Sequence, residues 1–324
     1  MRSDALLTIG MPVFNGERFL PLALDSLLRQ TFDDFVIILS DNASTDRTEE
    51  IGRDYAASDR RIRYLRSAYN VGAGNNFLKV YTMAKSKYYK QAAHDDFCHP
   101  RFLETCISAL EKDSGLTVSF TKVRIVDSEG ILVEDYECPM RVADNDPVVR
   151  FADLILVSHR CFPIFGIHRM NALRQLPAMG RYAHADGVLL AQLGLLGRFY
   201  ESPDRLFTST RHARQSVWTP ASRITQGGFR LTRRVGRLPS LEWWDPSRRR
   251  EVVLPECNIL RKYWESVHHS RLTVSQKTRA YSVIVHWAWK YHRKLLGDFV
   301  LAADQVLWKW QTRHTGTLDH AINE

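Results

Sequence analysis

The chain has 324 residues, of which 44% are hydrophobic and 25% are charged, a composition typical of a folded globular protein and unlike that of a disordered one. No run approaches the ~20 consecutive apolar residues that a membrane-spanning helix needs, and residues 1–7 lack the pattern of a secretory signal. Five cysteines without a CxxC pair argue against a disulfide framework and a structural zinc site. We therefore expect a cytoplasmic protein.

The formal net charge is +9, and arginines late in the chain contribute much of the excess. They are Arg230, Arg233, Arg234, Arg237, Arg248, Arg249 and Arg250. A basic surface attracts nucleic acid, anionic lipid or phosphate-bearing substrates, but it can equally serve only to keep a protein in solution. The charge alone leaves these alternatives open.

The first part of the chain alternates between short apolar runs and segments of helical periodicity. The predicted strands are 6–13, 35–40, 62–65, 88–93 and 116–126, and the predicted helices between them cover about 19–28, 46–55, 75–84 and 100–112. This alternation predicts an α/β fold with a mostly parallel, Rossmann-like sheet flanked by helices on both faces. Ligands bind such sheets at the carboxyl ends of the strands.

Polar residues stand where these predicted strands end. They include Asn15, Asp41, Asn70 and Asp95, and we expect them to converge on one crevice. Asp95 and Asp96 form an adjacent pair of carboxylates, which repel one another unless a cation or strong donors compensate. A divalent metal that also binds a diphosphate is one such compensator. Capping of the helix that follows is the alternative.

The later part of the chain is less regular. A Leu-rich helix follows Asp186, and Phe199–Tyr200 begins another short strand. From about residue 223 the pattern becomes that of long helices rich in Arg and Trp, so we divide the chain into residues 1–220 and a helical region, 221–324. The tail contains Trp287, Trp289, Trp308 and Trp310. Its aromatic side chains either pack against the first region or another subunit, or lie in a membrane interface.

Five motifs in a fixed order resemble those of family 2 glycosyltransferases with the glycosyltransferase A fold. The motifs are Met11–Glu17, Ser26–Phe32, Asp41–Asp46, Asn70–Gly72 and His94–Asp96. The likeness covers roughly residues 6–216 and includes the order and the spacing of the motifs. The expected architecture is therefore this fold with a helical C-terminal extension.

The resemblance implies which residues bind the donor nucleotide. They are Pro12, Phe14, Glu17, Asp41, Asn70, Gly72 and Asp95, with Asp41 reading the base. It also implies that Asp95 and Asp96 match the metal-binding motif and that the cofactor is Mn²⁺ or Mg²⁺. Ala93 stands where the family often has its first Asp, so the residue that holds the metal is left open. His212 is a further candidate contact of the metal or diphosphate, with Arg214 beside it.

The family places a catalytic base at the start of a Leu-rich helix, and Asp186 matches that position, with Ala185 in place of the usual Glu. Helix capping is the alternative role. The implied activity is inverting transfer of a sugar from a nucleoside-diphosphate sugar, with UDP favoured, to a hydroxyl group of a glycan, lipid-linked or small-molecule acceptor. His159, Arg160 and Phe165–Gly166 are candidates for the acceptor side.

Three other functions stay open at this level. A nucleotidyltransferase would be expected to have a Gly-rich phosphate loop after the first strand, where this chain has Pro12–Asn15. A basic nucleic-acid-binding module would use the Arg and Trp residues of the tail, although the chain has no nucleic-acid motif. A catalytically inactive relative is suggested by Ala93 and Ala185. We expect no nucleic-acid partner, and leave open contact with the inner face of the membrane and self-association through the C-terminal helices.

Overall fold

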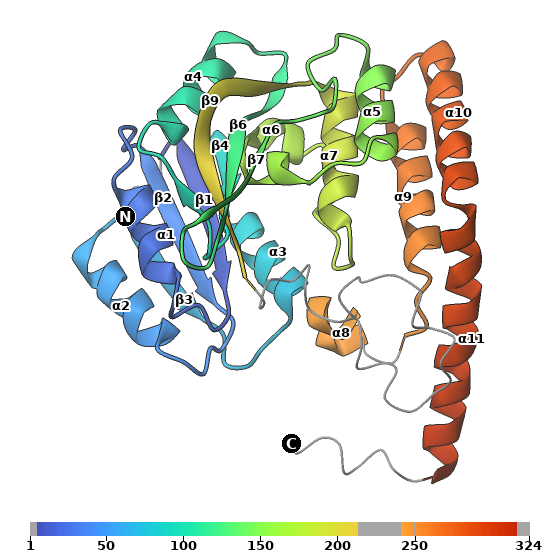
Figure 1. The fold of residues 1–324 in the computed structure, drawn as a ribbon, viewed down its shortest axis with the longest axis horizontal. Helices are drawn as coiled ribbons and strands as arrows, with labels where there is room; N and C mark the ends of the chain where they lie inside the picture. The colour runs from blue at the N-terminus through green and yellow to red at the C-terminus, as the bar shows by residue number, and fades with distance from the viewer. Residues whose placement is uncertain (1–4, 213–240, 249–250, 316–324) are drawn as a thin grey trace.

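The structure is a computed structural model that describes residues 5–212, 241–248 and 251–315 (Figure 1). Within these residues nine strands form one sheet in the order β3-β2-β1-β4-β8-β6-β9-β5, with β7 paired to β6 off this path. The strands are β1 (Leu7–Val13), β2 (Phe35–Asp41), β3 (Ile62–Arg66), β4 (Tyr88–Gln91), β5 (Phe97–Cys98), β6 (Leu116–Asp127), β7 (Leu132–Tyr136), β8 (Ile167–Arg169) and β9 (Arg198–Arg211).

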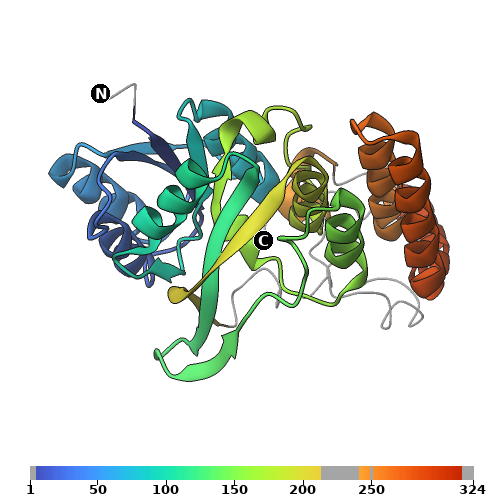
Figure 2. The same cartoon turned by 90° about the horizontal axis from the view of Figure 1, so that it is seen from above.

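Helices cover both faces of the sheet (Figures 1 and 2), as the sequence predicted. One face packs against α1, α2 and α4, and the other against α3, α6 and α7. The helices are α1 (Leu20–Leu28), α2 (Thr48–Ser58), α3 (Ala73–Met83), α4 (Phe102–Lys112), α5 (Pro147–Leu156), α6 (Met170–Leu173), α7 (Ala185–Leu196), α8 (Leu241–Trp244), α9 (Pro255–His269), α10 (Val274–Lys290) and α11 (His292–Thr315), with short 3₁₀ helices η1 (Phe162–Phe165) and η4 (Pro246–Arg248).

The four strands β3, β2, β1 and β4 are parallel neighbours, which confirms that part of the prediction. Every residue of β1 is buried, because helices cover a central parallel strand on both sides. Its register with β2 runs from Leu7 opposite Phe35 to Val13 opposite Asp41. Both strands therefore end at one edge of the sheet, where the predicted polar residues begin.

The second half of the sheet differs from the prediction. β6 does not pair with β4, because the three-residue strand β8 lies between them and runs antiparallel to both. The short strand expected at Phe199–Tyr200 was wrong in length: β9 has 14 residues and pairs in parallel with β6. The register shifts between Ser202 and Arg205, where Pro203 has no N–H to donate to the ladder.

The predicted C-terminal helices are present and share a hydrophobic core with the first part of the chain. Buried side chains of α9 and α10 pack against α5 and α7, and they include Ile259, Tyr263, Ile284 and Trp287. The expected boundary near residue 220 lies outside the described residues, so the division into two regions remains a prediction. No helix among those described has both the length and the hydropathy needed to cross a bilayer.

Candidate functional site

Hydrogen bonds join the loops that follow β1, β2 and β3. Asn15 accepts from the backbone N–H of Thr45 at 2.8 Å, and its own N–H donates to Ser44 Oγ at 2.9 Å. In the next pair of loops, Asn42 Nδ2 donates to Asn70 Oδ1 at 2.8 Å. The same Asn70 oxygen accepts from the N–H of Gly72 at 2.9 Å. The predicted convergence of Asn15, Asp41 and Asn70 at one edge of the sheet is therefore present.

Backbone strain is concentrated in these loops and at the start of α7. Among the described residues, the non-glycine residues with positive φ are Asn15 (51°), Ala43 (61°) and His184 (67°). This left-handed conformation is unfavourable for residues with a Cβ atom, and it tends to persist at functional sites that the surrounding structure holds in place. Asn15 and Ala43 belong to segments that the sequence motifs had marked, and His184 directly precedes the marked Ala185 and Asp186.

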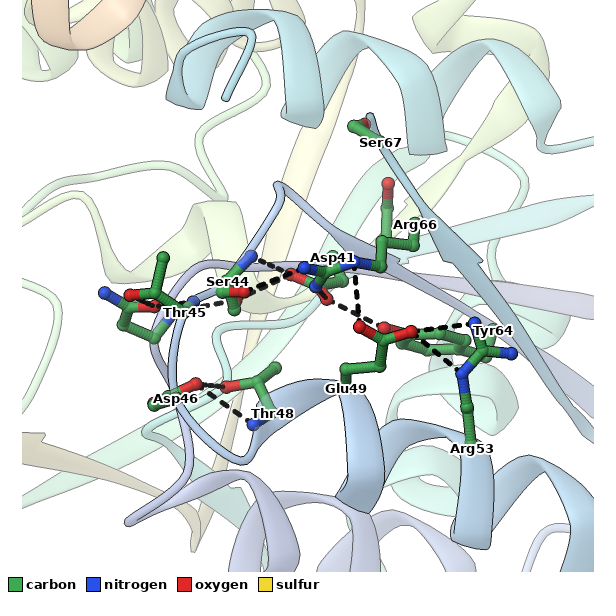
Figure 3. A network of polar contacts seen from close by, with 12 residues as sticks. Asp41, Ser44, Thr45, Asp46, Thr48, Glu49, Arg53, Tyr64, Arg66 and Ser67 are labelled. Atoms are coloured by element: carbon green, nitrogen blue, oxygen red, sulfur yellow. Dashed lines mark hydrogen bonds and ion pairs between the residues drawn. The ribbon is translucent and has the colours of Figure 1, made fainter. Parts of the chain in front are cut away.

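Asp41 is completely buried, and protein groups bind both of its carboxylate oxygens (Figure 3). Oδ1 accepts from the N–H of Ser44 at 2.8 Å and from its hydroxyl at 2.6 Å, while Oδ2 accepts from Tyr64 at 2.7 Å and from Arg66. Burial and then the hydrogen bond to Asp41 raise the pKa of the Tyr64 hydroxyl. Asp41 thus holds the loop after β2 in its shape.

Asp95 and His212 form a hydrogen-bonded pair that links the loop after β4 to the end of β9. Asp95 Oδ2 lies 2.9 Å from His212 Nε2, and the His212 ring stacks on Phe19 with centroids 4.9 Å apart. Burial would raise the pKa of the Asp95 carboxyl, but the hydrogen bond to His212 and the charge of His94 outweigh it and lower the pKa. Asp95 is therefore an anion in a largely buried place.

Gly16 allows the loop after β1 to approach this pair. A Cβ atom at Gly16 would lie 2.7 Å from His94 Cδ2 and 2.6 Å from Val13 Cγ2, which is closer than real contacts allow. The absence of a side chain at Gly16 lets the loop after β1 reach the His94–Asp95 segment. The loops after β1 and β4 consequently meet at the same edge of the sheet.

Asp96 points to a different place from its neighbour. Its Oδ1 accepts from the backbone N–H of Thr210 at 3.0 Å, and the side chain is almost completely buried. Burial and then the negative charge of Asp95 raise the pKa of Asp96 well above its ordinary value. In this structure Asp96 fixes the end of β9, the segment that carries His212.

Asp186 lies in the first turn of α7, in contact with a set of residues other than those around Asp95. Cys161, His184 and Asp186 each place a possible ligand atom within 4.8 Å of the others, and theirs is the one such cluster of His, Cys and acidic groups that the described residues contain. Burial, the charge of Asp186 and a hydrogen bond to it raise the pKa of the Cys161 thiol well above its ordinary value. The thiol is thus neutral and lies beside the Asp186 carboxylate.

The C-terminal region contributes to the surroundings of Asp186 and of Gly72. Tyr263 of α9 places its hydroxyl 3.3 Å from His184 Nε2. A Cβ atom at Gly72, where φ is 86°, would lie 2.7 Å from the carbonyl oxygen of Trp244 in α8. Arg181 bonds to Asn75 at 2.9 Å and forms an ion pair with Asp245 at 2.9 Å. Residues after position 240 therefore support both places.

Sequence reasoning missed Cys161, His184 and Tyr263. Cys161 and Tyr263 are single residues outside any motif, so no local pattern in the sequence marks them. His184 has a left-handed backbone conformation directly before α7, where the chain changes direction sharply from a loop into a helix. Of the other candidates, Pro12 is buried in β1, Phe14 is exposed, and Glu17 accepts from the N–H of Arg47 at 3.1 Å. Arg214 lies outside the described residues.

The residues predicted to lie near the acceptor, His159, Arg160 and Phe165, differ in their contacts. His159 Nδ1 lies 2.8 Å from the carbonyl oxygen of Val157, and the His159 ring is close enough to Asp186 to interact with its charge. Arg160 pairs with Glu134 at 2.7 Å. Phe165 stacks on Phe207 and accepts a hydrogen bond from Lys90 at its carbonyl oxygen, so its contacts are those of the interior.

Comparison with known proteins identifies what the chain is similar to. A model of the family described as glycosyl transferase family 2 matches residues 8–172, about half of the chain. The chondroitin synthase of Escherichia coli is 30% identical over 136 residues, which are 42% of this chain and 20% of that protein. An uncharacterised glycosyltransferase of Methanocaldococcus jannaschii is 28% identical over 134 residues, 41% of this chain and 46% of that protein. The chain thus spans less than half of the length of either relative.

Solved structures resemble this one over most of its length. Residues 1–349 of S. aureus TarS in complex with UDP give a TM-score of 0.59 at 14% identity and cover 89% of this chain and 72% of that one. The complex with UDP-GlcNAc gives 0.60 at 15% identity and covers 88% and 73%. At these identities the likeness shows a shared fold, which is the glycosyltransferase A fold expected from the sequence.

Proposed function

Because the chain belongs to glycosyl transferase family 2 and is thus a glycosyltransferase, we propose that it transfers a sugar with inversion from a nucleoside-diphosphate sugar to a hydroxyl group. The observation that carries this proposal is the series of contacts that joins the loops after β1, β2, β3 and β4 at one edge of the sheet, where Asp95 of the last loop bonds to His212. Such an edge is where parallel α/β sheets bind ligands. UDP is the favoured nucleotide, because TarS, which has the same fold, binds UDP and UDP-GlcNAc.

In this proposal the donor nucleotide lies against the joined loops. Phe14 is exposed and offers an aromatic surface, Glu17, Asn70 and Gly72 belong to the same loops, and Pro12 is buried in β1 just before the first of them. Asp41 shapes the base-binding wall through Ser44 and Arg66, since its own oxygens are already bound by protein donors. The proposed recognition of the base therefore includes Ser44 and Arg66 as well as Asp41.

Asp95 and His212 are the residues that would hold a divalent metal. The Asp95 carboxylate, whose pKa is lowered, offers the oxygen donors that Mn²⁺ and Mg²⁺ prefer, and the His212 imidazole 2.9 Å away adds a nitrogen donor that fits Mn²⁺ better than Mg²⁺. When bound, the cation neutralises charge on the departing diphosphate. Asp96 is buried and accepts a hydrogen bond from Thr210, so it would hold the end of β9 in place and with it His212.

Asp186 would act as the general base. Its carboxylate accepts the proton of the acceptor hydroxyl while the hydroxyl oxygen forms a bond to the anomeric carbon. The bond between that carbon and the phosphate oxygen breaks on the opposite face, and the nucleoside diphosphate leaves with the electron pair. Cys161 and His184 lie beside the same carboxylate, so both would orient it.

The acceptor is a glycan, a lipid-linked sugar or a small molecule. We place the reaction in the cytoplasm, because all five cysteines are free, which suits a reducing compartment.

Thermal unfolding in the presence of nucleotides tests the donor side of the proposal. We expect UDP to raise the melting temperature when Mn²⁺ is present, and chelation to remove most of that effect. GDP and dTDP serve as comparisons. If no nucleotide stabilises the protein under any metal condition, the donor assignment is wrong.

Turnover of Asp186→Asn tests the base. Sugar nucleotides are screened for release of nucleoside diphosphate with water as the default acceptor. We expect the variant to lose at least about a hundredfold in rate while it binds UDP as the parent protein does. A parent protein that binds UDP and turns over no donor would instead be a catalytically inactive relative, and loss of UDP binding in the variant would exclude Asp186 as the base.

A further inference from the structure

The outward side of α10 and α11 carries an unusual set of exposed side chains. The two helices lie end to end along one edge of the molecule, with α9 between them and the sheet (Figures 1 and 2). We define the outer face by its exposed apolar residues: Val285, Trp289, Leu296, Phe299, Val300, Val306 and Leu307. Their exposed fractions range from 42% for Val300 to 74% for Trp289.

The outer face is continuous along both helices. Val285 and Trp289 of α10 are four residues apart, and Leu296, Phe299 or Val300, and Leu307 of α11 follow one another at intervals of three, four or seven residues, which in each helix is the spacing of one side. The opposite side is anchored to the protein. Ile284 and Trp287 are buried in the core. Asp298 accepts from the N–H of Cys257 in α9 at 2.8 Å.

The exposed charges beside this apolar stripe are of one sign. Between Val274 and Leu307 every exposed charged side chain is basic: Arg279, Lys290, Arg293 and Lys294. The acidic residues of this stretch are Asp298, which is buried, and Asp304, which is half-buried. Arg279 pairs with Asp146 at 2.6 Å, Lys294 lies 3.8 Å from Glu256, and Lys290 donates to the carbonyl oxygen of Leu156 at 2.7 Å. These partners all lie on the inner side, and Arg293 is the basic residue beside the stripe that points to none of them.

We propose that the outer face lies on an anionic lipid bilayer. An amphipathic helix with a Trp and other apolar residues on one side and basic residues at its borders binds in the interfacial plane of a membrane. The apolar side chains enter the boundary between headgroups and acyl chains, and the basic groups meet the phosphates. Trp289 adds a ring of the type enriched at that depth.

A second copy of the chain is a less suitable occupant. A two-fold interface brings the same surface of each copy together. The outer face would then bring Arg293 of both copies into one interface, with no exposed carboxylate between Val274 and Leu307 to compensate them. A bilayer with phosphatidylglycerol supplies the missing negative charge.

Vesicle flotation of the full chain tests the proposal. Neutral phosphatidylcholine vesicles are compared with vesicles that also contain phosphatidylglycerol, at low and high salt. We expect binding to the anionic vesicles and its reduction by salt, because screening weakens attraction to the surface. Arg293→Gln should lower partitioning about fivefold. Absence of binding to anionic vesicles would overturn the proposal.

The apolar part has its own variants. Leu296→Glu and Phe299→Glu should each lower partitioning at least about tenfold, since a charge replaces a side chain that would be removed from water. Ile131→Glu is the matched control, because Ile131 is exposed to 65%, as Leu296 is to 63%, but lies in the turn between β6 and β7. Equal losses for Ile131→Glu and Leu296→Glu would contradict a role of the outer face.

Two further measurements keep the outcome clear. The emission of Trp289 is obtained by subtracting the fluorescence spectrum of Trp289→Phe from that of the wild type. Its maximum should shift to shorter wavelength on anionic vesicles. The only variant that this measurement requires is a conservative one. Sedimentation without lipid reports the alternative: a dimer that Leu296→Glu dissociates, together with unchanged Trp289 emission on vesicles, would assign the outer face to self-association. Neither measurement uses a sugar donor, so the result stands apart from the proposed transferase activity.

Discussion

The hydroxyl of Tyr263 lies 3.3 Å from Nε2 of His184, so a helix from the last third of the chain contacts the residue two positions before Asp186. Tyr263 is 1% exposed, and its ring packs edge-on against Phe151 and Trp287. This hydrogen bond steadies a residue whose φ of 67° is strained. The contact connects the helical region to the candidate base.

We predict that Tyr263→Phe lowers kcat about three- to tenfold, the value of one hydrogen bond, and leaves the affinity for UDP unchanged. The phenyl ring keeps the packing, so thermal stability should change little. Steady-state kinetics and UDP titration measure the two effects. Tyr281→Phe, a change in a half-buried ring of α10, is the control. An equal loss in both variants would argue against a specific role for Tyr263.

Asp95 and His212 should govern the metal dependence of nucleotide binding. We expect Asp95→Asn and His212→Ala to weaken UDP binding in Mn²⁺ at least about tenfold and to make it insensitive to chelation. Isothermal titration with and without metal measures this. His269→Ala, an exposed histidine of α9, is the control. Retention of full Mn²⁺-dependent affinity by both site variants would remove the pair from the metal site.

The ion pair between Arg66 and Asp41 should contribute to stability. Arg66→Gln leaves a fully buried carboxylate without its cation, and we expect it to lower the free energy of unfolding by about 2–3 kcal/mol, less than for a wholly buried pair because Arg66 is partly exposed. Arg53→Gln breaks the exposed pair with Glu49 in the same network (Figure 3) and should cost under about 0.5 kcal/mol. Urea unfolding distinguishes these outcomes, and equal costs would contradict the assignment.

His168 should make the fold sensitive to acid. It is buried, its Nε2 lies 3.0 Å from the carbonyl oxygen of Ile164, and burial lowers its pKa to about 4. The unfolded chain, with an ordinary pKa of about 6.5, binds a proton first as the pH falls. Stability is therefore complete above the unfolded value and is lost as the pH falls towards the folded one, by about 2 kcal/mol between about pH 7 and about pH 5.

Substitution isolates this contribution from those of the other titratable groups. His168→Gln keeps a donor for Ile164 but does not titrate, so the difference in unfolding free energy between parent and variant should shrink by that amount on acidification. Urea midpoints at the two pH values measure it. A difference that stays constant would mean that His168 is not responsible.

The sequence was most informative where structure is local. The apolar runs of β1 to β4 and the polar residues after them were predicted because a buried parallel strand is apolar throughout and ends abruptly. β8 was not predicted, because a strand of three residues is too short to show a pattern in the sequence. β9 was read as short because Glu201, Pro203 and Asp204 interrupt its apolar residues.

The site divides in the same way. The motifs marked Asp95, His212 and Asp186 as candidates, but the hydrogen bonds of Asp41 to Tyr64 and Arg66 depend on the pairing of β2 with β3. Cys161 and Tyr263 reach His184 and Asp186 from distant segments, which only the packing of α7 against η1 and α9 brings near. Side chains contributed by tertiary contact leave no trace in a motif.

The burial of Ile259, Tyr263 and Trp287 against α5 and α7 bears on how reagents should be made from this chain. A shortened fragment that ends where the family match ends, or at residue 220, would give up these side chains and open an apolar surface to water. Such a fragment would aggregate during purification, and a lack of activity in it would not test the function of the enzyme. Expression libraries should therefore keep the helices through Leu307.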